Sequence, residues 1–154
     1  MINYKVAKFI HEEVERQGFR VGTAIHTQRC IWMADAWEFG ESMRAISGSI
    51  ITSDIVTIGH YVEPEINARG FRKVGVCVGD WTAPHQDAVP RLIEAWCEAV
   101  NDGRFTPDEA YKEFELIHPF ADGNGRTGKI IHNMLGNTMD EPVLVQDFFG
   151  CGVP

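Results

Sequence analysis

The residues best suited to chemistry gather in one short stretch, HPFADGNGRTGK, at positions 118–129. Its glycines are Gly123, Gly125 and Gly128. Glycines let backbone N–H groups approach an anion closely, and the helix that follows presents its positive amino end to the same point. The stretch therefore predicts a cradle for a phosphate group.

Four side chains of the same stretch are suited to work beside a bound phosphate. Arg126 and Lys129 stand at i and i+3 of the expected helix, so both cations are within reach of phosphate oxygens. Asp122 could hold Mg²⁺, which often takes a single protein carboxylate and completes its shell with phosphate and water. His118 is the group here that can take up a proton near neutral pH.

The same letters also satisfy two nucleotide-binding patterns that lack their usual surroundings. The glycines spell G-x-G-x-x-G, with Asp147 in a strand-like stretch further on, but a helical pattern rather than a strand leads into them. Residues 123–129 also spell G-x-x-x-x-G-K, but Ile130 stands where such a loop needs Ser or Thr for Mg²⁺. Both patterns are therefore minor alternatives.

The whole stretch resembles the motif of the Fic (Fic/Doc) family, H-x-F-x-(D/E)-G-N-G-R-x-x-R, and matches every fixed position except the last. Upstream, RGFRKVGVCVG and APHQDAVPRLIEAW are similar to the family's flap and the helix after it. The similarity spans about residues 70–135, and the first third of the chain is only loosely similar.

The resemblance implies a mainly α fold, a Fic-type helical bundle with a small β-hairpin flap over the active site, in a single Fic-like domain over residues 1–154. The implied activity is protein adenylylation, in which AMP passes from ATP to a Ser, Thr or Tyr hydroxyl of a target protein. ATP would be the cosubstrate and Mg²⁺ the cofactor.

Residue roles follow from the matched positions. His118 would deprotonate the target hydroxyl, Asp122 would bind Mg²⁺, and Arg126 would hold the β- and γ-phosphates. The implied catalytic residues are His118, Asp122, Asn124 and Arg126. The implied nucleotide-binding residues are Gly123, Asn124, Gly125, Arg126 and Lys129. Phe120 is expected to anchor the loop in the core.

Upstream of the motif, apolar and other residues alternate with a period of two over residues 72–80, which is typical of a half-exposed strand. Taken alone, the pattern indicates an ordinary hairpin edge. The resemblance implies that this edge pairs with the backbone of the target protein and so positions its hydroxyl. The implied docking residues are Lys73, Val74, Gly75 and Val76.

The chain departs from the family pattern in two ways. Lys129 replaces the second Arg of the motif, which keeps the charge but loses the planar fork that grips a phosphate. Many family members also carry or borrow an inhibitory helix of pattern (S/T)-x-x-x-E-(G/N), and no Glu of this chain is followed by Gly or Asn. We expect either a separate antitoxin-like inhibitor or no restraint of this kind.

Two other functions stay open. One is a Doc-like protein kinase activity, although Doc-like members alter the anion-hole glycines that are present here. The other is a catalytically silent nucleotide-binding or interaction module of the same fold. Retention of both His118 and Asp122 argues against the silent module, since a binder needs the cradle but not the base.

Composition limits the partners. Among 154 residues, 14 Lys and Arg face 22 Asp and Glu, and the net charge of -8 argues against binding to nucleic acid or to an anionic membrane. The four cysteines form no C-x-x-C pair, and the charged first residues contain no apolar signal stretch. These features predict a cytoplasmic protein, for which a role as a toxin is one expectation.

The elements that position the motif are expected to be mostly helices. Apolar periodicity and capping residues predict helices over residues 3–17, 27–45, 91–101, 107–117 and 126–135. Thr106 and Glu109 form a capping box, and Pro107 takes the first helical position. Together they fix the start of the helix expected over residues 107–117. Residues 48–67 fit either a strand or a short helix, because β-branched residues there are interrupted by Ser53 and Asp54.

Overall fold

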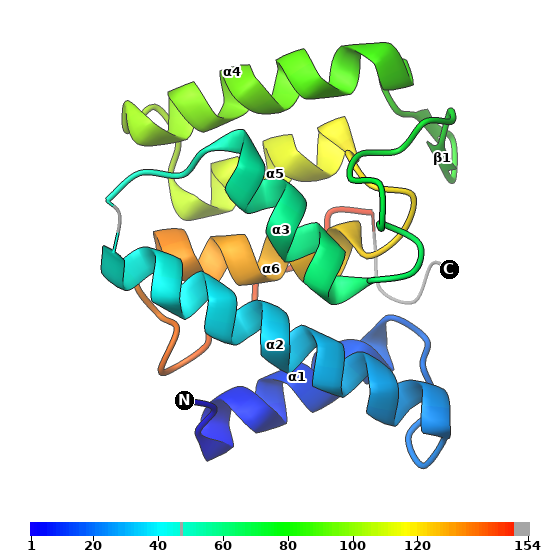
Figure 1. The fold of residues 1–154 in the computed structure, drawn as a ribbon, viewed down its shortest axis with the longest axis vertical. Coiled ribbons are helices and arrows are strands. Elements are labelled where there is room, and N and C mark those ends of the chain that lie inside the picture. The colour runs from blue at the N-terminus through cyan, green and yellow to red at the C-terminus, as the bar shows by residue number, and fades with distance from the viewer. Residues whose placement is uncertain (47, 150–154) are drawn as a thin grey trace.

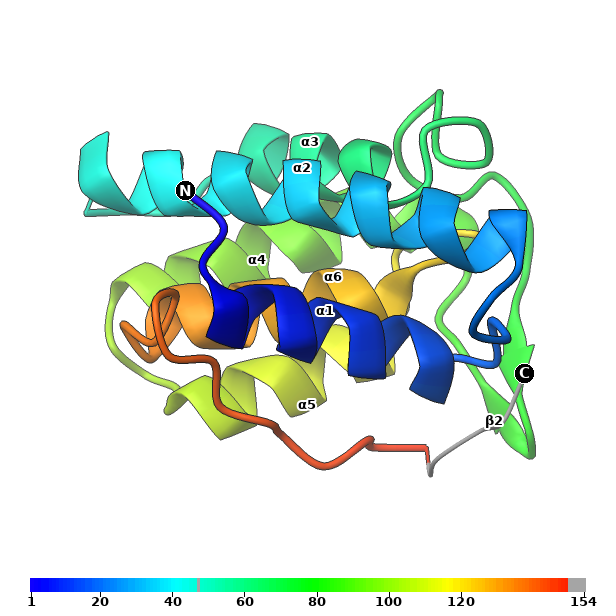
Figure 2. The ribbon, with the colours of Figure 1, turned by 90° about the horizontal axis from the view of Figure 1, so that it is seen from below.

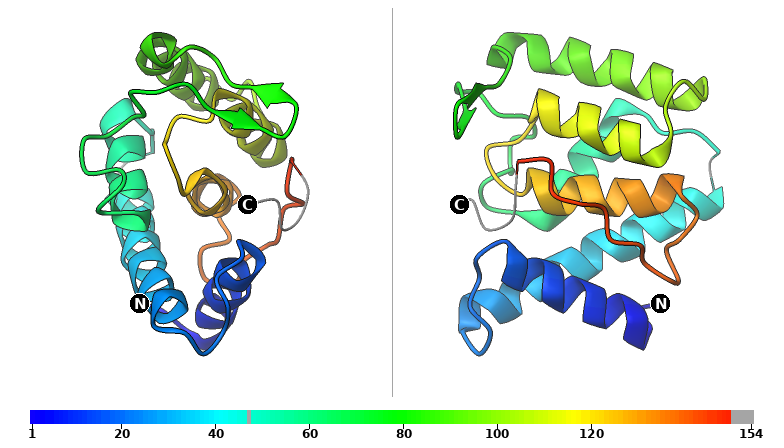
Figure 3. Two further views of the ribbon diagram at one scale, coloured as in Figure 1. Left: turned by 90° about the vertical axis from the view of Figure 1, so that its right-hand side faces the viewer. Right: turned by 180° about the vertical axis from the view of Figure 1, so that it is seen from behind.

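The fold is a bundle of helices around the motif helix, in a computed structural model that describes residues 1–46 and 48–149. Its helices are α1 (Tyr4–Arg16), α2 (Ala24–Ile46), α3 (Thr52–Val62), α4 (Val89–Asn101), α5 (Pro107–Ile117) and α6 (Asn124–Leu135). A short 3-10 turn, η1 (Gln86–Ala88), precedes α4. Figures 1 and 3 show α6 in the middle, and it packs against α2, α3 and α5. The predicted mainly helical fold is confirmed.

Local signals explain where these helices begin. Asn3 caps α1 by accepting the Val6 N–H at 3.0 Å. Thr106 and Glu109 form the predicted capping box at α5, with bonds of 3.2 and 2.8 Å between side chain and backbone. No helix within the described residues is both long and apolar enough to cross a membrane.

The ambiguous stretch after α2 is helical. Ile55, Ile58 and Val62 are all fully buried, and their spacing places them on one face of α3. Asp54, read as a breaker in sequence, instead accepts the Ile51 N–H at 2.9 Å and so caps the first turn. Tertiary packing of this apolar face outweighs the β-branched composition.

The predicted strand over residues 72–80 is wrong for most of its length. Only β1 (Cys77–Val78) is a strand, and it pairs antiparallel with β2 (Trp81–Thr82) in the register Cys77↔Thr82 and Val78↔Trp81. The Ala83 N–H extends the pairing to the Val76 carbonyl at 3.0 Å. Residues 72–75 are held outside any sheet because the Arg72 backbone and side chain bond to loop carbonyls instead.

The segment after α6 folds back along the bundle. Figure 2 shows it running from the far end of α6 toward the hairpin. Two contacts fix its course: Trp37 Nε1 donates to the Met139 carbonyl at 3.1 Å, and Asn133 Oδ1 accepts the Val143 N–H at 2.8 Å. Residues 147–149 are thereby brought to the end of the molecule that carries the motif loop.

Candidate active site

A cavity of about 470 Å³ lies where the motif loop, the hairpin and residues 147–149 meet. Most of the site residues predicted from sequence line it. They are Val76, His118, Asp122, Gly123, Asn124, Gly125 and Arg126. The other predicted residues, Lys73, Val74, Gly75 and Lys129, lie outside its wall.

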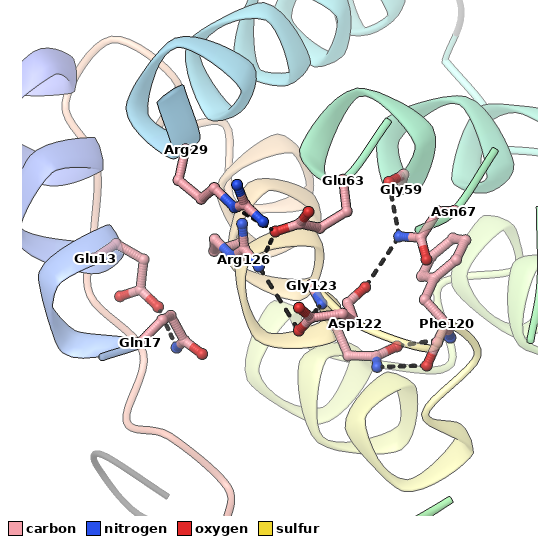
Figure 4. A network of polar contacts seen from close by, with 11 residues as sticks. Glu13, Gln17, Arg29, Gly59, Glu63, Asn67, Phe120, Asp122, Gly123 and Arg126 are labelled. Atoms are coloured by element: carbon pink, nitrogen blue, oxygen red, sulfur yellow. Dashed lines mark hydrogen bonds and ion pairs between the residues drawn. The ribbon is translucent and has the colours of Figure 1, made fainter. Parts of the chain in front are cut away.

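The loop between α5 and α6 is held in shape from within. Asn124 accepts the Phe120 N–H and donates to the Phe120 carbonyl, at 2.9 Å each. Phe120 is fully buried beside Gly59, where a Cβ atom would come within 2.1 Å of the ring. Asn67 donates to the Asp122 carbonyl at 2.9 Å (Figure 4). Phe120 is therefore the core anchor of the loop, and the Asn124 side chain is occupied in holding it.

The amino end of α6 has the geometry of an anion site. Gly123 caps it in the left-handed region (φ 79°, ψ 13°), which glycine adopts at little cost. The N–H groups of Asn124, Gly125 and Arg126 have no partner within the helix, because helical bonds begin at the next residue. A Cβ atom at Gly125 would come within 3.1 Å of the Gln17 side chain, so glycine avoids a close contact beside these free N–H groups. A phosphate fits these donors.

Arg126 brings a buried cation to the cavity. Its Nη2 atom lies 2.9 Å from Glu63 Oε1 and 3.8 Å from Asp122 Oδ1. Arg29 Nε donates to the same Glu63 oxygen at 2.9 Å (Figure 4). Two guanidinium groups thus share the Glu63 carboxylate, and Arg126 also pairs with the Asp122 carboxylate. Arg126 Nε and Nη1 are buried without a partner among the described residues, so they remain donors for a ligand oxygen.

His118 is the C-cap of α5 and lines the cavity. Its Nδ1 atom lies 3.3 Å from the Glu115 carbonyl, which can only accept, so Nδ1 carries the proton and Nε2 has the free lone pair. Burial lowers the pKa of His118 below its ordinary value, and the Arg72 charge adds to this. The hydrogen bond to Glu115 and the Asp122 charge oppose the shift. The ring is therefore neutral at pH 7 and able to accept a proton.

Asp122 presents a half-exposed carboxylate at the cavity. Its side chain is 49% exposed, and Oδ1 accepts the Gly123 N–H at 2.7 Å. No cluster of three or more His, Cys, Asp or Glu that could hold a metal occurs within residues 1–46 and 48–149. Mg²⁺ bound to phosphates needs only one or two carboxylates, so the chemistry of this site fits it.

Lys129 lies behind the cavity wall. Its ammonium group is fully buried, 2.5 Å from Glu13 Oε1 of α1 and paired also with Asp147. Glu13 in turn pairs with Arg16 and accepts from Gln17 at 2.8 Å (Figure 4 shows the latter bond). The cation at the last motif position is thus neutralised within the protein by residues from α1 and the segment after α6.

The predicted docking residues divide at Val76. Lys73, Val74 and Gly75 are exposed and precede the strand, and Val76 is half-buried in the cavity wall beside β1. The hairpin therefore forms one side of the cavity, as expected, but with a shorter strand than the alternation of valines suggested.

Sequence reasoning missed several residues of the site. Glu115 lines the cavity one helical turn before His118, and this spacing was a usable signal. Burial raises the pKa of Glu115 to about 7, while Lys129 opposes the shift. The ring of Phe149 meets the His118 ring edge-on with centroids 5.9 Å apart. Glu63 and Phe149 approach the motif only through tertiary folding, so no local signal could have found them.

Comparison with known proteins identifies the family and the fold. The Fic/DOC family model matches residues 49–135. A Fic family protein from Desulfovibrio desulfuricans G20 has a similar structure, with a TM-score of 0.67 and 19% sequence identity over 88% of this chain and 50% of that one. Fic-1 from C. elegans is also similar, with a TM-score of 0.73 and 19% identity over 94% of this chain and 52% of that one.

At this level of identity the two structures show a shared fold, and the chain spans about half the length of each. The family model, by contrast, matches more than half of the chain and includes the whole motif loop. The chain therefore belongs to the Fic/DOC family.

Proposed function

We propose that the protein transfers AMP from ATP to a Ser, Thr or Tyr hydroxyl of a target protein. One observation carries the proposal: a neutral imidazole and a phosphate cradle face the same cavity. His118 supplies the imidazole, and the amino end of α6 with Arg126 supplies the cradle. Transfer of a phosphorus-containing group asks little covalent work of a protein, and mainly requires positioning and charge stabilisation.

Each group has a role in the transfer. His118 accepts the hydroxyl proton at Nε2 while the hydroxyl oxygen bonds to the α-phosphorus. The bond from that phosphorus to the bridging oxygen breaks, and pyrophosphate leaves. The N–H groups at the start of α6 and Arg126 stabilise the phosphate charge. Mg²⁺ held by Asp122 would supply further neutralisation of that charge.

The target protein would dock on the hairpin. The segment of Lys73, Val74, Gly75 and Val76 leads into β1, and Val76 to Val78 line the cavity. An extended target backbone added here would place its side chain over His118. A separate antitoxin-like inhibitor remains a prediction, to be tested by purification from the native host.

A second candidate is a silent nucleotide-binding module. The burial of Lys129 between Glu13 and Asp147 favours it, since this cation is already neutralised and is not free to grip a γ-phosphate. The neutral imidazole of His118 favours catalysis, because binding alone needs no base.

Label transfer distinguishes the candidates. The purified protein is incubated in host lysate with Mg²⁺ and ATP labelled at either the α- or the γ-phosphate. AMP transfer predicts a discrete protein band labelled from α-ATP alone and lost in His118→Ala. Label from γ-ATP alone would indicate the Doc-like kinase reaction. No label from either, together with ATP binding by calorimetry, would indicate the silent module.

A further inference from the structure

Arg72 is a buried cation that pairs with no carboxylate in the part of the chain that the structure describes. The residue is 3% exposed, and no Asp or Glu of the described ranges lies within ion-pair distance of its guanidinium. Buried arginines are usually paired, since an isolated charge is costly to remove from water. Burial accordingly lowers the pKa of Arg72. Hydrogen bonds to the surrounding structure must offset this cost.

Among the described residues, the guanidinium donates only to backbone carbonyls. Nε donates to His118 at 2.7 Å, and Nη2 reaches Ile117 at 3.4 Å. Nη1 donates to Val74 at 3.0 Å, and Nη2 to Pro84 at 2.6 Å. The first two carbonyls belong to the end of α5, and the other two to the chain entering and leaving the hairpin. One side chain thus links the base to both stems of the hairpin.

The link holds His118 in an uncommon backbone conformation. Its backbone is left-handed (φ 51°, ψ 62°), a conformation that is uncommon for any residue with a side chain. The Arg72 N–H also bonds to the carbonyl of the next residue, Pro119, at 2.9 Å. The backbone on both sides of the imidazole is therefore fixed by Arg72. The end of α5 is also where a cation is favoured by the helix dipole.

We propose that Arg72 is a positioning residue that holds the hairpin and the His118 backbone as one unit, so that a strand docked on the hairpin presents its hydroxyl to the imidazole. The role in presenting a hydroxyl rests on the proposed function. The link between the hairpin and His118 depends only on the four hydrogen bonds of the Arg72 side chain.

Charge and hydrogen bonding by Arg72 can be separated. Two side-chain charges act on the His118 ring: Arg72 favours its neutral form and Asp122 its protonated form. Lysine at position 72 would keep the charge but lose the planar fork that reaches both stems. Glutamine would lose the charge and most of the donors. Both variants should therefore loosen the hairpin, and only Arg72→Gln should also remove the charge that acts on the imidazole.

The test compares Arg72→Lys and Arg72→Gln with Arg69→Gln, an exposed arginine three residues away. Circular dichroism first confirms that each variant is folded. Hydrogen exchange of the Ala83 amide, which closes the hairpin, should accelerate at least tenfold in both Arg72 variants and stay unchanged in Arg69→Gln. NMR titration of His118 should show a raised pKa in Arg72→Gln only. Unchanged exchange at Ala83 in the folded Arg72→Lys variant would overturn the proposal.

Turnover gives an independent readout. In Arg72→Lys, the rate of label transfer from α-ATP should fall at least tenfold, while the Kd for ATP measured by calorimetry stays within threefold of wild type. Equal losses in transfer and in ATP binding would indicate a merely structural residue and overturn the proposal. If wild type itself transfers no label while Ala83 exchange still responds, the proposed function fails and the link between hairpin and His118 stands.

Discussion

The ammonium of Lys129 on α6 lies 2.5 Å from Glu13 Oε1 on α1, and both side chains are fully buried. This pair joins the motif helix to the first helix of the chain, and Asp147 joins the segment after α6 to the same cation. Glu115 is close enough for Lys129 to oppose the rise in its pKa. Lys129 thus interacts with carboxylates from α1, from α5 and from the segment after α6.

Removal of the Lys129 ammonium group should destabilise the folded protein. We expect Lys129→Met to lower the free energy of unfolding by about 3 kcal/mol, because buried carboxylates lose their counter-charge. Urea unfolding at pH 7 measures the change. Lys8→Met, on the exposed face of α1, is the matched control and should change stability by less than about 0.5 kcal/mol. Equal stability of Lys129→Met and wild type would contradict the burial of this ion pair.

Glu115 should make stability depend on pH. Its folded pKa of about 7 lies above the ordinary 4.5, so the folded state binds the proton more tightly than the unfolded chain. Stability from this group is present below pH 4.5 and is lost as pH rises through 7. Glu115→Gln removes the cost of ionising a buried carboxyl group and should stabilise the protein by up to about 3 kcal/mol at high pH.

Thermal unfolding of Glu115→Gln and wild type at pH 5 and pH 8 measures this effect. The difference between the two proteins should be larger at pH 8. Glu98→Gln, exposed on α4, is the control for loss of a carboxylate. A difference that shrinks as pH rises would have the wrong sign and would refute the assignment.

Gly59 should tolerate no side chain. A Cβ atom there would come within 2.1 Å of the Phe120 ring, so Gly59→Ala must displace the anchor of the motif loop. We expect a loss of about 3 kcal/mol in stability and weaker ATP binding, since the loop carries the cradle. Denaturant unfolding and calorimetry measure the two effects. Gly75→Ala, where no atom lies within 4 Å of the added Cβ, should leave stability nearly unchanged.

The neutral imidazole of His118 predicts a specific pH profile. Because its pKa lies below 6.5, kcat/KM for label transfer should be level from about pH 8 to about pH 6.5 and should fall at lower pH as the base is protonated. Repeating the profile with Glu115→Gln separates the two cavity groups. A midpoint well above pH 7 that persists in this variant would rule out His118 as the base.

Sequence predicted the parts of the fold that local signals control. Apolar periodicity predicted a helix close to the bounds of α1, Thr106 and Glu109 cap α5, and the chain turns at His118 before Pro119. Each depends on residues within a few positions of one another. The geometry at the start of α6 was predictable for the same reason, since one short stretch contains the glycines, Arg126 and His118, and phosphate binding there stays a prediction.

Contacts between distant segments were not predictable. Glu63 meets Arg126, which lies 63 positions further along the chain, and Glu13 meets Lys129, which lies 116 positions further along. The extent of the strand was overestimated because Arg72 draws its own neighbours toward α5. A period of two reports alternation of side chains, but it does not reveal that the backbone has other partners.

The most direct test of the account is the His118→Ala variant, measured for ATP binding and for transfer in the same preparation. We predict that the Kd for ATP changes by less than threefold, because the cradle is intact, while transfer of label from α-ATP falls by about 10²- to 10⁴-fold. Near-normal transfer in His118→Ala, or loss of binding and transfer in equal measure, would contradict the account.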